Sequence, residues 1–384
     1  MAHSMTVHEA IPITDDDVHR SLDSVGRRVQ DSILDPWLED VTVEMLRNLY
    51  RDMRVVRRID AEGVALQRQG ELGLWAPCQG QEAAQVGAGR ALASGDFVFP
   101  SYREHGFLYV RGGEPSEFVR MWRAEELSAY DPAIRRMGSP QIIIGAQTLH
   151  AVGYAMGARF DQERAVAAGD VSTEVDVAIA CFGDGATSQG DVSEAMVFAS
   201  SYDAPVVFFC QNNHFAISEP VQVQSRVAIA GRAEGFGIAA LRIDGNDVLA
   251  VHAAMRWALD HARSGRGPAF IEAVTYRMGP HTTADDPTRY RDPEELQHWR
   301  DRDPLTRVEA FLRAHESFDD AFVADVEAEA DAFTAAMRHS AVTYQSRSAV
   351  SVLDNVYAEP HTGIDRARVE FGAYVNSLAE EDLA

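Results

Sequence analysis

Acidic and amide side chains follow two strongly apolar runs in the middle of the chain. The run 175–182 leads into Gly183-Asp184-Gly185, and the run 206–210 is followed by the adjacent amides Asn212 and Asn213. Carboxylate, amide and carbonyl oxygens are the ligands that a hard cation such as Mg²⁺ prefers, and substrate phosphates often complete its coordination. The two glycines leave room for close approach to the backbone. The pattern therefore predicts a site at which Asp184 and Asn213 hold a metal ion and a phosphate-bearing ligand.

The elements that position these side chains form a βαβ pattern. A helical pattern at about residues 191–199 separates the apolar runs 175–182 and 206–210, as is typical of parallel strands joined by a crossover helix. Further strands are predicted at 241–245 and 268–276. Open α/β sheets bind ligands at the carboxyl ends of their strands, where the polar residues lie. We therefore expect an α/β fold with a doubly wound, mostly parallel sheet flanked by helices.

Three other segments carry side chains that could contact such a ligand. Tyr102 and Arg103 follow a proline turn, and a guanidinium binds phosphate through two hydrogen bonds. His281 lies in a polar loop beyond the last predicted strand, a plausible position for catalysis. A solvated loop histidine and a surface arginine are the alternatives. The apolar run 142–144 is predicted to be a buried turn that could wall an aromatic ring, although periodicity alone favours plain core packing.

Composition excludes several classes of protein. The 384 residues include 59 acidic and 35 basic side chains, with a formal net charge of −24, so nucleic acid and anionic membranes are poor partners. The sequence has no lysine, which excludes a Schiff-base lysine and a P-loop lysine on this chain. No run approaches the roughly 18 apolar residues of a membrane span, and no G-x-G-x-x-G follows a strand. We expect a reduced, cytoplasmic protein rather than a Rossmann-type nicotinamide enzyme.

The chain is expected to divide into three parts. Residues 1–40 are polar and acidic and are predicted to form an N-terminal arm that is ordered only against a partner, if at all. Residues 41–312 are expected to hold the α/β domain, with a long helix at 41–69 and charged peripheral helices at 111–138. Residues 313–384 are predicted to form a C-terminal helical region.

In combination these segments resemble the alpha subunit of the decarboxylating first component of 2-oxo acid dehydrogenase complexes, which depends on thiamine diphosphate. The resemblance extends over about residues 41–312. Its most specific feature is the separation of Gly185 from Asn212 by residues 186–211. The other segments that carry it are residues 80–83, 101–106, 144–147 and 276–281.

The resemblance implies thiamine diphosphate and Mg²⁺ as cofactors. The metal would be held by the side chains of Asp184 and Asn213 and by the carbonyl of Phe215. The diphosphate would contact Tyr102, Arg103, His281 and the backbone N–H groups of Gly185 and Ala186. The Ile144 backbone would meet the aminopyrimidine, and residues 142–144 would help to bend the cofactor. His281 would also be the catalytic residue beside the thiazolium. The residues expected to bind cofactor are Tyr102, Arg103, Ile142, Ile144, Gly183, Asp184, Gly185, Ala186, Asn213, Phe215 and His281.

The same resemblance implies oxidative decarboxylation of a 2-oxo acid and acyl transfer to the lipoyl group of the second-component acyltransferase. In this family a glutamate from a separate beta subunit activates the cofactor, so the chain is expected to supply half of an active site in an α2β2 heterotetramer. Pyruvate and branched-chain acids such as 3-methyl-2-oxobutanoate are the expected substrates. An acetoin dehydrogenase alpha subunit and a non-catalytic assembly paralogue are the alternatives.

Two positions depart from the pattern of the family. Gln211 replaces an arginine that helps to bind phosphate in some branched-chain members, so one positive contact is missing. Thr282 occupies the position of a serine that is phosphorylated in the animal enzymes. The resemblance therefore leaves regulation by phosphorylation in doubt.

Overall fold

The computed structural model describes residues 17–124, 128–170 and 174–381. In these ranges the chain up to Ala341 belongs to one compact unit, and the chain from Val342 onwards belongs to a second. Helix α11 (Pro304–Ala314) runs through residue 312 and packs on α1 (Val43–Arg68). The division at residues 40 and 312 stays a prediction about the organisation of the chain.

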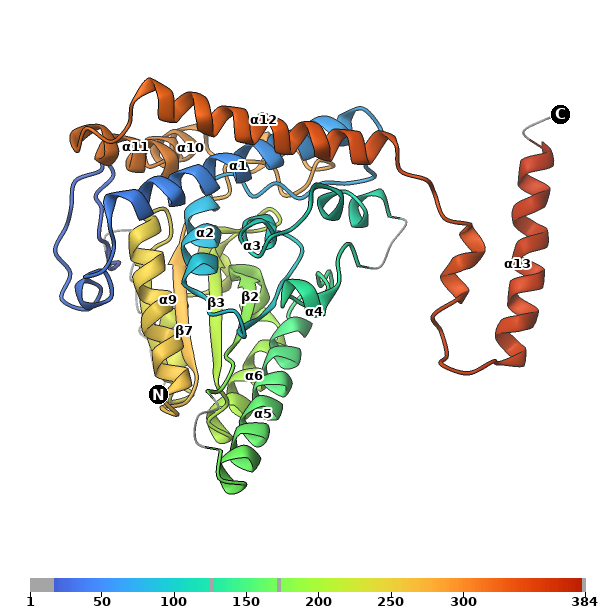
Figure 1. The fold of residues 1–384 in the computed structure, drawn as a ribbon, viewed down its shortest axis with the longest axis horizontal. Helices are drawn as coiled ribbons and strands as arrows, with labels where there is room; N and C mark the ends of the chain where they lie inside the picture. The colour runs from blue at the N-terminus through green and yellow to red at the C-terminus, as the bar shows by residue number, and fades with distance from the viewer. Residues whose placement is uncertain (1–16, 125–127, 171–173, 382–384) are drawn as a thin grey trace, which may run out of the picture. The chain divides into compact units, whose positions relative to one another are not determined.

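The first unit is built on a five-stranded parallel sheet with the strand order β1-β2-β3-β7-β6 (Figure 1). A short antiparallel pair, β4 (Phe215–Ala216) and β5 (Glu219–Pro220), lies outside this sheet. The predicted fold class, α/β with a mostly parallel sheet flanked by helices, is confirmed. The strands of the sheet are β1 (Phe97–Phe99), β2 (Ala178–Gly183), β3 (Val206–Asn212), β6 (Ala239–Asp244) and β7 (Ala269–Val274).

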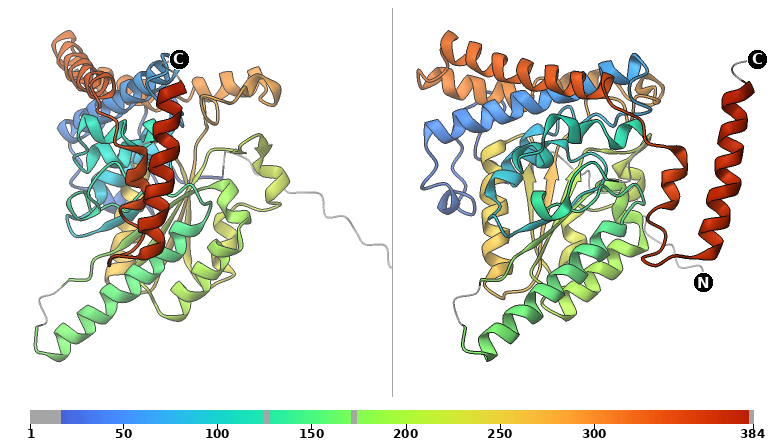
Figure 2. Two further views of the ribbon diagram at one scale, coloured as in Figure 1. Left: turned by 90° about the vertical axis from the view of Figure 1, so that its right-hand side faces the viewer. Right: turned by 45° about the vertical axis from the view of Figure 1, so that its right-hand side comes forward.

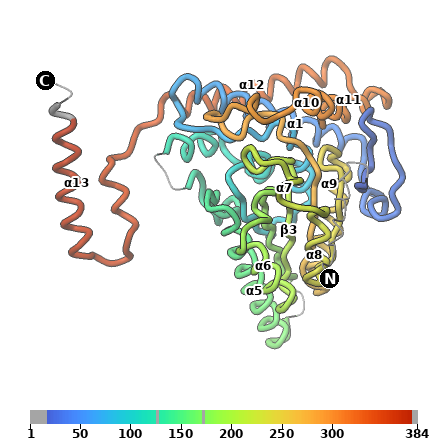
Figure 3. Tube along the Cα trace, turned by 180° about the vertical axis from the view of Figure 1, so that it is seen from behind, coloured from blue at the N-terminus to red at the C-terminus, as the bar shows by residue number. Residues whose placement is uncertain are grey.

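Alternate side chains of the central strands enter two different cores, because successive residues of a strand point to opposite faces. Val207 and Phe209 pack in the core shared with the helices α1, α2 and α9. Val206 and Phe208 pack in the core shared with α5, α6 and α8. Figures 2 and 3 show these two helical layers from other sides. The helices span α2 (Glu82–Ala91), α5 (Ala146–Ala167), α6 (Gly190–Ser201), α8 (Ala230–Glu234) and α9 (Val248–Arg263).

Two long helices run side by side along one edge of the first unit, at the top of Figure 1. Helix α1 begins where the Thr42 hydroxyl accepts a hydrogen bond from the backbone N–H of Met45 (3.1 Å). Three arginines of α1 form ion pairs with α12 (Asp320–Val342): Arg51 with Asp325, Arg54 with Glu327, and Arg58 with Asp331. Exposed pairs of this kind contribute little stability, about 0–1 kcal/mol each. Among the described residues, no helix is both long and apolar enough to cross a membrane.

Residues 17–40 contact the sheet domain, so the prediction that the whole arm is ordered only against a partner is wrong for this part. The backbone N–H groups of Ser21 and Leu22 donate to the buried carboxylate of Asp247 (2.6 and 2.5 Å). Leu22 and Leu34 are fully buried in the main core. These two apolar anchors are too few to stand out in a polar sequence. Residues 1–16 of the predicted arm lie outside the described residues.

The prediction of helices at 111–138 is also wrong for the described part of that stretch. It forms short 3-10 turns and one four-residue helix, α4 (Pro132–Arg135). Ala124 and Arg136 adopt left-handed backbone conformations at the ends of two of these segments. Such residues end a helical turn, so the charged composition does not produce the longer helices that were expected.

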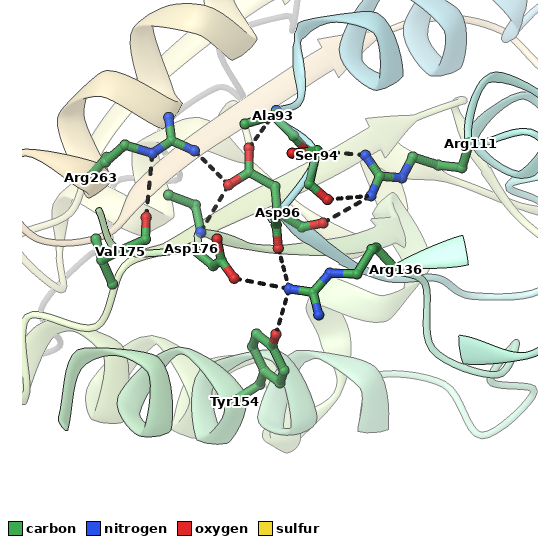
Figure 4. A network of polar contacts seen from close by, with 11 residues as sticks. Ala93, Ser94, Asp96, Arg111, Arg136, Tyr154, Val175, Asp176 and Arg263 are labelled. Carbon is green, nitrogen blue, oxygen red and sulfur yellow. Dashed lines mark hydrogen bonds and ion pairs between the residues drawn. The ribbon is translucent and has the colours of Figure 1, made fainter. Parts of the chain in front are cut away.

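A buried carboxylate, Asp96, secures the amino ends of β1 and β2 (Figure 4). It accepts hydrogen bonds from the backbone N–H groups of Ala93 (2.8 Å) and Val177 (3.0 Å) and from the guanidinium of Arg263 (2.5 Å). A charge that is buried needs this many donors, because an unpaired one would be strongly destabilising. The sheet is therefore fixed at its amino ends, while its carboxyl ends are left for the functional site.

Candidate active site

A cavity of about 210 Å³ lies at the carboxyl ends of β2, β3 and β7. The strand order reverses between β3 and β7, and ligands of open α/β sheets bind at such a reversal. Six segments line it: the turn after β2, the end of β3 with the residues that follow, the loop after β7, residues 101–104, Gln81 ahead of α2, and Ile144 with Gln147 at the start of α5. The predicted site residues that line it are Tyr102, Arg103, Ile144, Gly183, Asp184, Gly185, Ala186, Asn213, Phe215 and His281.

Ile142 does not line this cavity. Ile142 and Ile143 are 68% and 72% exposed, and Ile144, which does line the cavity, is 38% exposed. The predicted buried turn is therefore wrong: the run lies on the surface, ahead of the left-handed Gly145 (φ 91°) that begins α5. Neighbouring exposed apolar side chains often mark a contact surface. The cofactor contact expected for Ile142 stays a prediction.

Asp184 begins the 3-10 turn that follows β2 and is almost completely buried in the cavity wall. Burial raises the pKa of its carboxyl from 3.8 to about 6, although nearby donors, including the backbone of Asn213 and the amide of Gln224 (3.3 Å), act in the opposite direction. Gly185 follows it, and a Cβ there would lie 2.7 Å from the Cβ of Ala216. The glycine is required by the close approach of these two chain segments.

The amide and the carbonyl predicted to complete the metal site lie after β3. Asn213 is 6% exposed, and its Oδ1 accepts a hydrogen bond from the backbone N–H of Phe215 (3.3 Å). The carbonyl oxygen of Phe215 accepts a hydrogen bond from Arg277 (3.1 Å). A guanidinium repels a cation, so the carbonyl of Phe215 is a poorer metal ligand in this arrangement than Asp184 or Asn213.

Arg103 and His281 contact each other in the cavity wall. An Arg103 Nη2 donates to the Nδ1 (3.2 Å) and to the carbonyl oxygen (2.9 Å) of His281. Because a guanidinium has no acceptor, Nδ1 must be the unprotonated nitrogen, and the neutral ring carries its proton on Nε2. Burial, Arg103 and Arg277 lower the pKa of His281 to about 4. At neutral pH His281 can therefore donate a hydrogen bond from Nε2 without carrying a charge.

Arg277 is a second guanidinium in the cavity wall, and sequence reasoning gave it no role. It is 1% exposed and donates to the carbonyls of Phe215 (3.1 Å) and Ile217 (2.5 Å) and to the hydroxyl of Tyr290 (2.8 Å). Asp285 then accepts from that hydroxyl (2.5 Å) and from the backbone N–H of His281 (2.7 Å). The signal for this residue in the sequence is an arginine directly after a predicted buried strand, in a chain that has no lysine.

Gln211 also lines the cavity, and its side chain is committed to a network of buried polar groups. Its Oε1 accepts from Gln85 (3.1 Å), and its Nε2 donates to Glu104 (2.8 Å). Gln85 also donates to the carbonyl of Arg103 (3.0 Å). The network therefore ties β3 to the segment that carries Arg103.

The donor set fits a phosphate-bearing ligand accompanied by a divalent cation. Arg103, Arg277 and the Nε2–H of His281 can face anionic oxygens, and Asp184 with the Oδ1 of Asn213 can face a hard cation. Within the described ranges, no three His, Cys, Asp or Glu side chains are grouped so that they could hold a metal ion by themselves. A cation at this site would therefore need amide, backbone and ligand oxygens in addition to Asp184.

The fold and the site define an α/β protein whose cavity at the strand-order reversal carries donors suited to a phosphate-bearing ligand. The family described as "Dehydrogenase E1 component" matches residues 50–346, and the chain belongs to this family. The predicted family is thereby confirmed.

Two curated relatives indicate the type of subunit. The 3-methyl-2-oxobutanoate dehydrogenase subunit alpha of Mycobacterium tuberculosis (strain CDC 1551 / Oshkosh) is 44% identical over 336 residues, which cover 87% of this chain and 88% of the relative. The pyruvate dehydrogenase E1 component subunit alpha of Bacillus subtilis (strain 168) is 41% identical over 289 residues, which cover 72% of each chain.

Proposed function

We propose that this chain is the alpha subunit of a thiamine diphosphate-dependent 2-oxo acid dehydrogenase, and that it acts with a beta subunit in an α2β2 assembly. The observation that carries the proposal is the buried Asp184, which lines one cavity at the strand-order reversal together with Asn213, Arg103, Arg277 and His281. The family to which the chain belongs supports the same conclusion. The cytoplasmic location and the lipoyl-bearing acyltransferase as acyl acceptor are part of this proposal.

In the proposed site, Mg²⁺ is held by the carboxylate of Asp184 and the Oδ1 of Asn213, with the carbonyl of Phe215 as a further ligand. Tyr102, Arg103 and the Nε2–H of His281 hold the diphosphate oxygens. The backbone N–H groups of Gly185 and Ala186 add neutral donors at the turn after Gly183. The backbone of Ile144 borders the aminopyrimidine, and residues 142–144 help to bend the cofactor. These donors match the negative charge of a diphosphate, which a metal ion neutralises only in part.

When bound, thiamine diphosphate supplies a nucleophilic carbon and an electron sink for decarboxylation. The chain's own residues orient the reacting groups and exclude water. Because the ring of His281 is neutral at pH 7, we propose that its single N–H group, on Nε2, fixes the bound cofactor beside the substrate through the diphosphate, and that the ring does not deliver a proton from an imidazolium. Arg277 holds the carbonyls of Phe215 and Ile217 and so shapes the wall next to this histidine.

The preferred 2-oxo acid is proposed to be pyruvate or a branched-chain acid, because relatives named for both are similar to this chain. Pockets discriminate one methylene by only about 1–3 kcal/mol, so both acids can be substrates. A panel of pyruvate, 3-methyl-2-oxobutanoate and acetoin, assayed with the beta subunit present, ranks the alternatives. A non-catalytic paralogue would turn over none of them.

Calorimetry on the assembled enzyme tests the proposal directly. Thiamine diphosphate should bind in the presence of Mg²⁺, and binding should be lost with excess chelator or in Asp184→Asn. A matched control is Asp203→Asn, which changes an exposed carboxylate in a turn after α6. Binding that is unaffected by chelator would contradict the metal assignment, and an assembled enzyme that binds no thiamine diphosphate would contradict the proposed function.

A further inference from the structure

Gln81 is a buried amide at the cavity wall to which no role has been given. It occupies the N-cap position of α2, is 1% exposed and lines the cavity. Its Oε1 accepts a hydrogen bond from the Nδ2 of Asn213 (3.0 Å). Its Nε2 has no hydrogen-bond partner within the described part of the chain. Most buried polar groups in proteins are paired, so an unpaired N–H group on a buried side chain that lines a cavity calls for a partner.

The positions of the oxygen and the nitrogen in the Gln81 amide follow from a chain of hydrogen bonds that starts at a backbone N–H group. The two ends of an amide cannot be told apart by shape, and they are assigned from their partners. Phe215 offers a backbone N–H, which can only donate, so the atom of Asn213 that faces it must be Oδ1. The Nδ2 of Asn213 then faces Gln81, and the facing atom of Gln81 must be Oε1. It follows that the free end of Gln81 is a donor.

Each end of the side chain has a consequence for the site. The acceptor end of Gln81 binds the Nδ2 of Asn213. This contact orients the Asn213 amide so that its Oδ1 points away from Gln81 and towards Phe215. The donor end can pair with an acceptor that enters the cavity. Asn213 and Asp184 lie in the same wall, so the acceptor that reaches Gln81 belongs to the group that accompanies the metal.

We propose that Gln81 is a positioning residue for Asn213 and, through its Nε2–H, a hydrogen-bond donor to a diphosphate oxygen of the bound cofactor. The inference rests on the proposed function, because it takes its ligand from there. It adds a neutral donor to a site that also has side-chain donors on Tyr102, Arg103, Arg277 and His281. A glutamine suits both tasks, since it is the one side chain besides asparagine that presents an acceptor and two donors on a planar group.

Two substitutions separate the two ends of the side chain. Gln81→Glu at pH 8 keeps the acceptor for Asn213, removes the donor and places a negative charge near the diphosphate. Gln81→Met has a similar volume and removes both ends. Gln69→Glu is the matched control, because Gln69 lies at the end of α1, where its Oε1 accepts from Arg338 (2.6 Å) and a carboxylate would be tolerated.

The measurements are the Kd of thiamine diphosphate by calorimetry, the Mn²⁺ concentration needed for half-maximal cofactor binding, and the Tm of the ligand-free assembled enzyme. We expect Gln81→Glu to weaken cofactor binding about tenfold or more, the value of a hydrogen bond to a charged group, with the Mn²⁺ requirement unchanged. Gln81→Met should weaken cofactor binding and also raise the Mn²⁺ requirement. Gln69→Glu should match the wild type in all three.

The outcomes decide between a binding role and a structural one. Wild-type Kd values in both Gln81 variants would overturn the inference. A lower ligand-free Tm together with equal losses of cofactor affinity in both variants would also overturn it, because that pattern belongs to a residue that only supports the fold. If the wild-type enzyme itself binds no thiamine diphosphate, the proposed function fails, and this result is separate from any effect of Gln81.

Discussion

Replacing Asp184 by asparagine should stabilise the metal-free enzyme while abolishing its metal-dependent cofactor binding. Burial raises the pKa of this carboxyl from 3.8 to about 6. Each pKa unit corresponds to 1.36 kcal/mol, so ionising Asp184 in the folded state costs about 3 kcal/mol at pH 7. Asparagine has nearly the same shape and no charge. The variant should therefore gain stability of this order when no cation offsets the charge.

The pH dependence of this gain has a definite sign. A carboxyl whose pKa is raised by folding contributes stability that is fully present below its unfolded pKa and is lost as the pH rises through its folded pKa. Wild type and Asp184→Asn should thus have equal stability at pH 3.5, and their difference should grow between about pH 4 and 6. In the wild type, protons compete with the metal, so metal affinity should fall about tenfold per pH unit below about pH 6.

Thermal unfolding of the chelator-treated assembled enzyme from pH 3.5 to 8 measures the stability difference between the wild type and Asp184→Asn. Mn²⁺ titration measures how the metal affinity of the wild type changes with pH. Asp203→Asn serves as the control, because it removes an exposed carboxylate and should shift neither curve. A destabilised Asp184→Asn at pH 7 in chelator would refute the reasoning, since it would mean that the charge at this position supports the fold without a cation.

Three further perturbations test other parts of the site. His281→Ala should lower kcat about 10²-fold or more with little change in Tm, because the ring lies in a loop and acts on bound ligand; an unchanged kcat would make it a solvated loop histidine. Arg277→Met should leave the carbonyls of Phe215 and Ile217 without their guanidinium donor, costing about 1–3 kcal/mol, and hydrogen exchange in residues 281–290 should quicken; unchanged exchange would contradict the bracing role. The purified chain alone should release no carbon dioxide from a 2-oxo acid and should gain activity with its beta subunit; comparable turnover without that subunit would refute the half-site proposal.

Most of the sheet could be predicted from the sequence because its strands are buried on both faces. Continuous apolar runs ending in polar residues indicate strands such as β2 and β3, and they also locate Asp184 and Asn213 at the same edge. The three-residue β1 was missed, since it is too short for a periodic pattern. The run 142–144 was misjudged because hydrophobicity alone cannot distinguish a core segment from an exposed apolar surface.

The roles of the amides could not be predicted, because they depend on partners that are distant in the sequence. The fold brings Gln81 to Asn213, and Gln211 to Gln85 and Glu104, across long separations in the sequence. Composition gives no information on such pairs. The same limit applies to Arg277, whose partners are two backbone carbonyls and a tyrosine.

The network around Gln211 explains why this chain has a glutamine rather than an arginine at that position. The backbone N–H of Gly106 donates to the Oε1 of Gln85 (2.8 Å), so the Nε2 of Gln85 must be the group that donates to Gln211. Gln211 accepts at one end and donates to Glu104 at the other. An arginine has donors only, and it would face the donor of Gln85 with another donor. The glutamine is therefore required by its neighbours. In this chain the positive charge for the cavity comes from Arg103 and Arg277, while the amides set which atoms face the ligand.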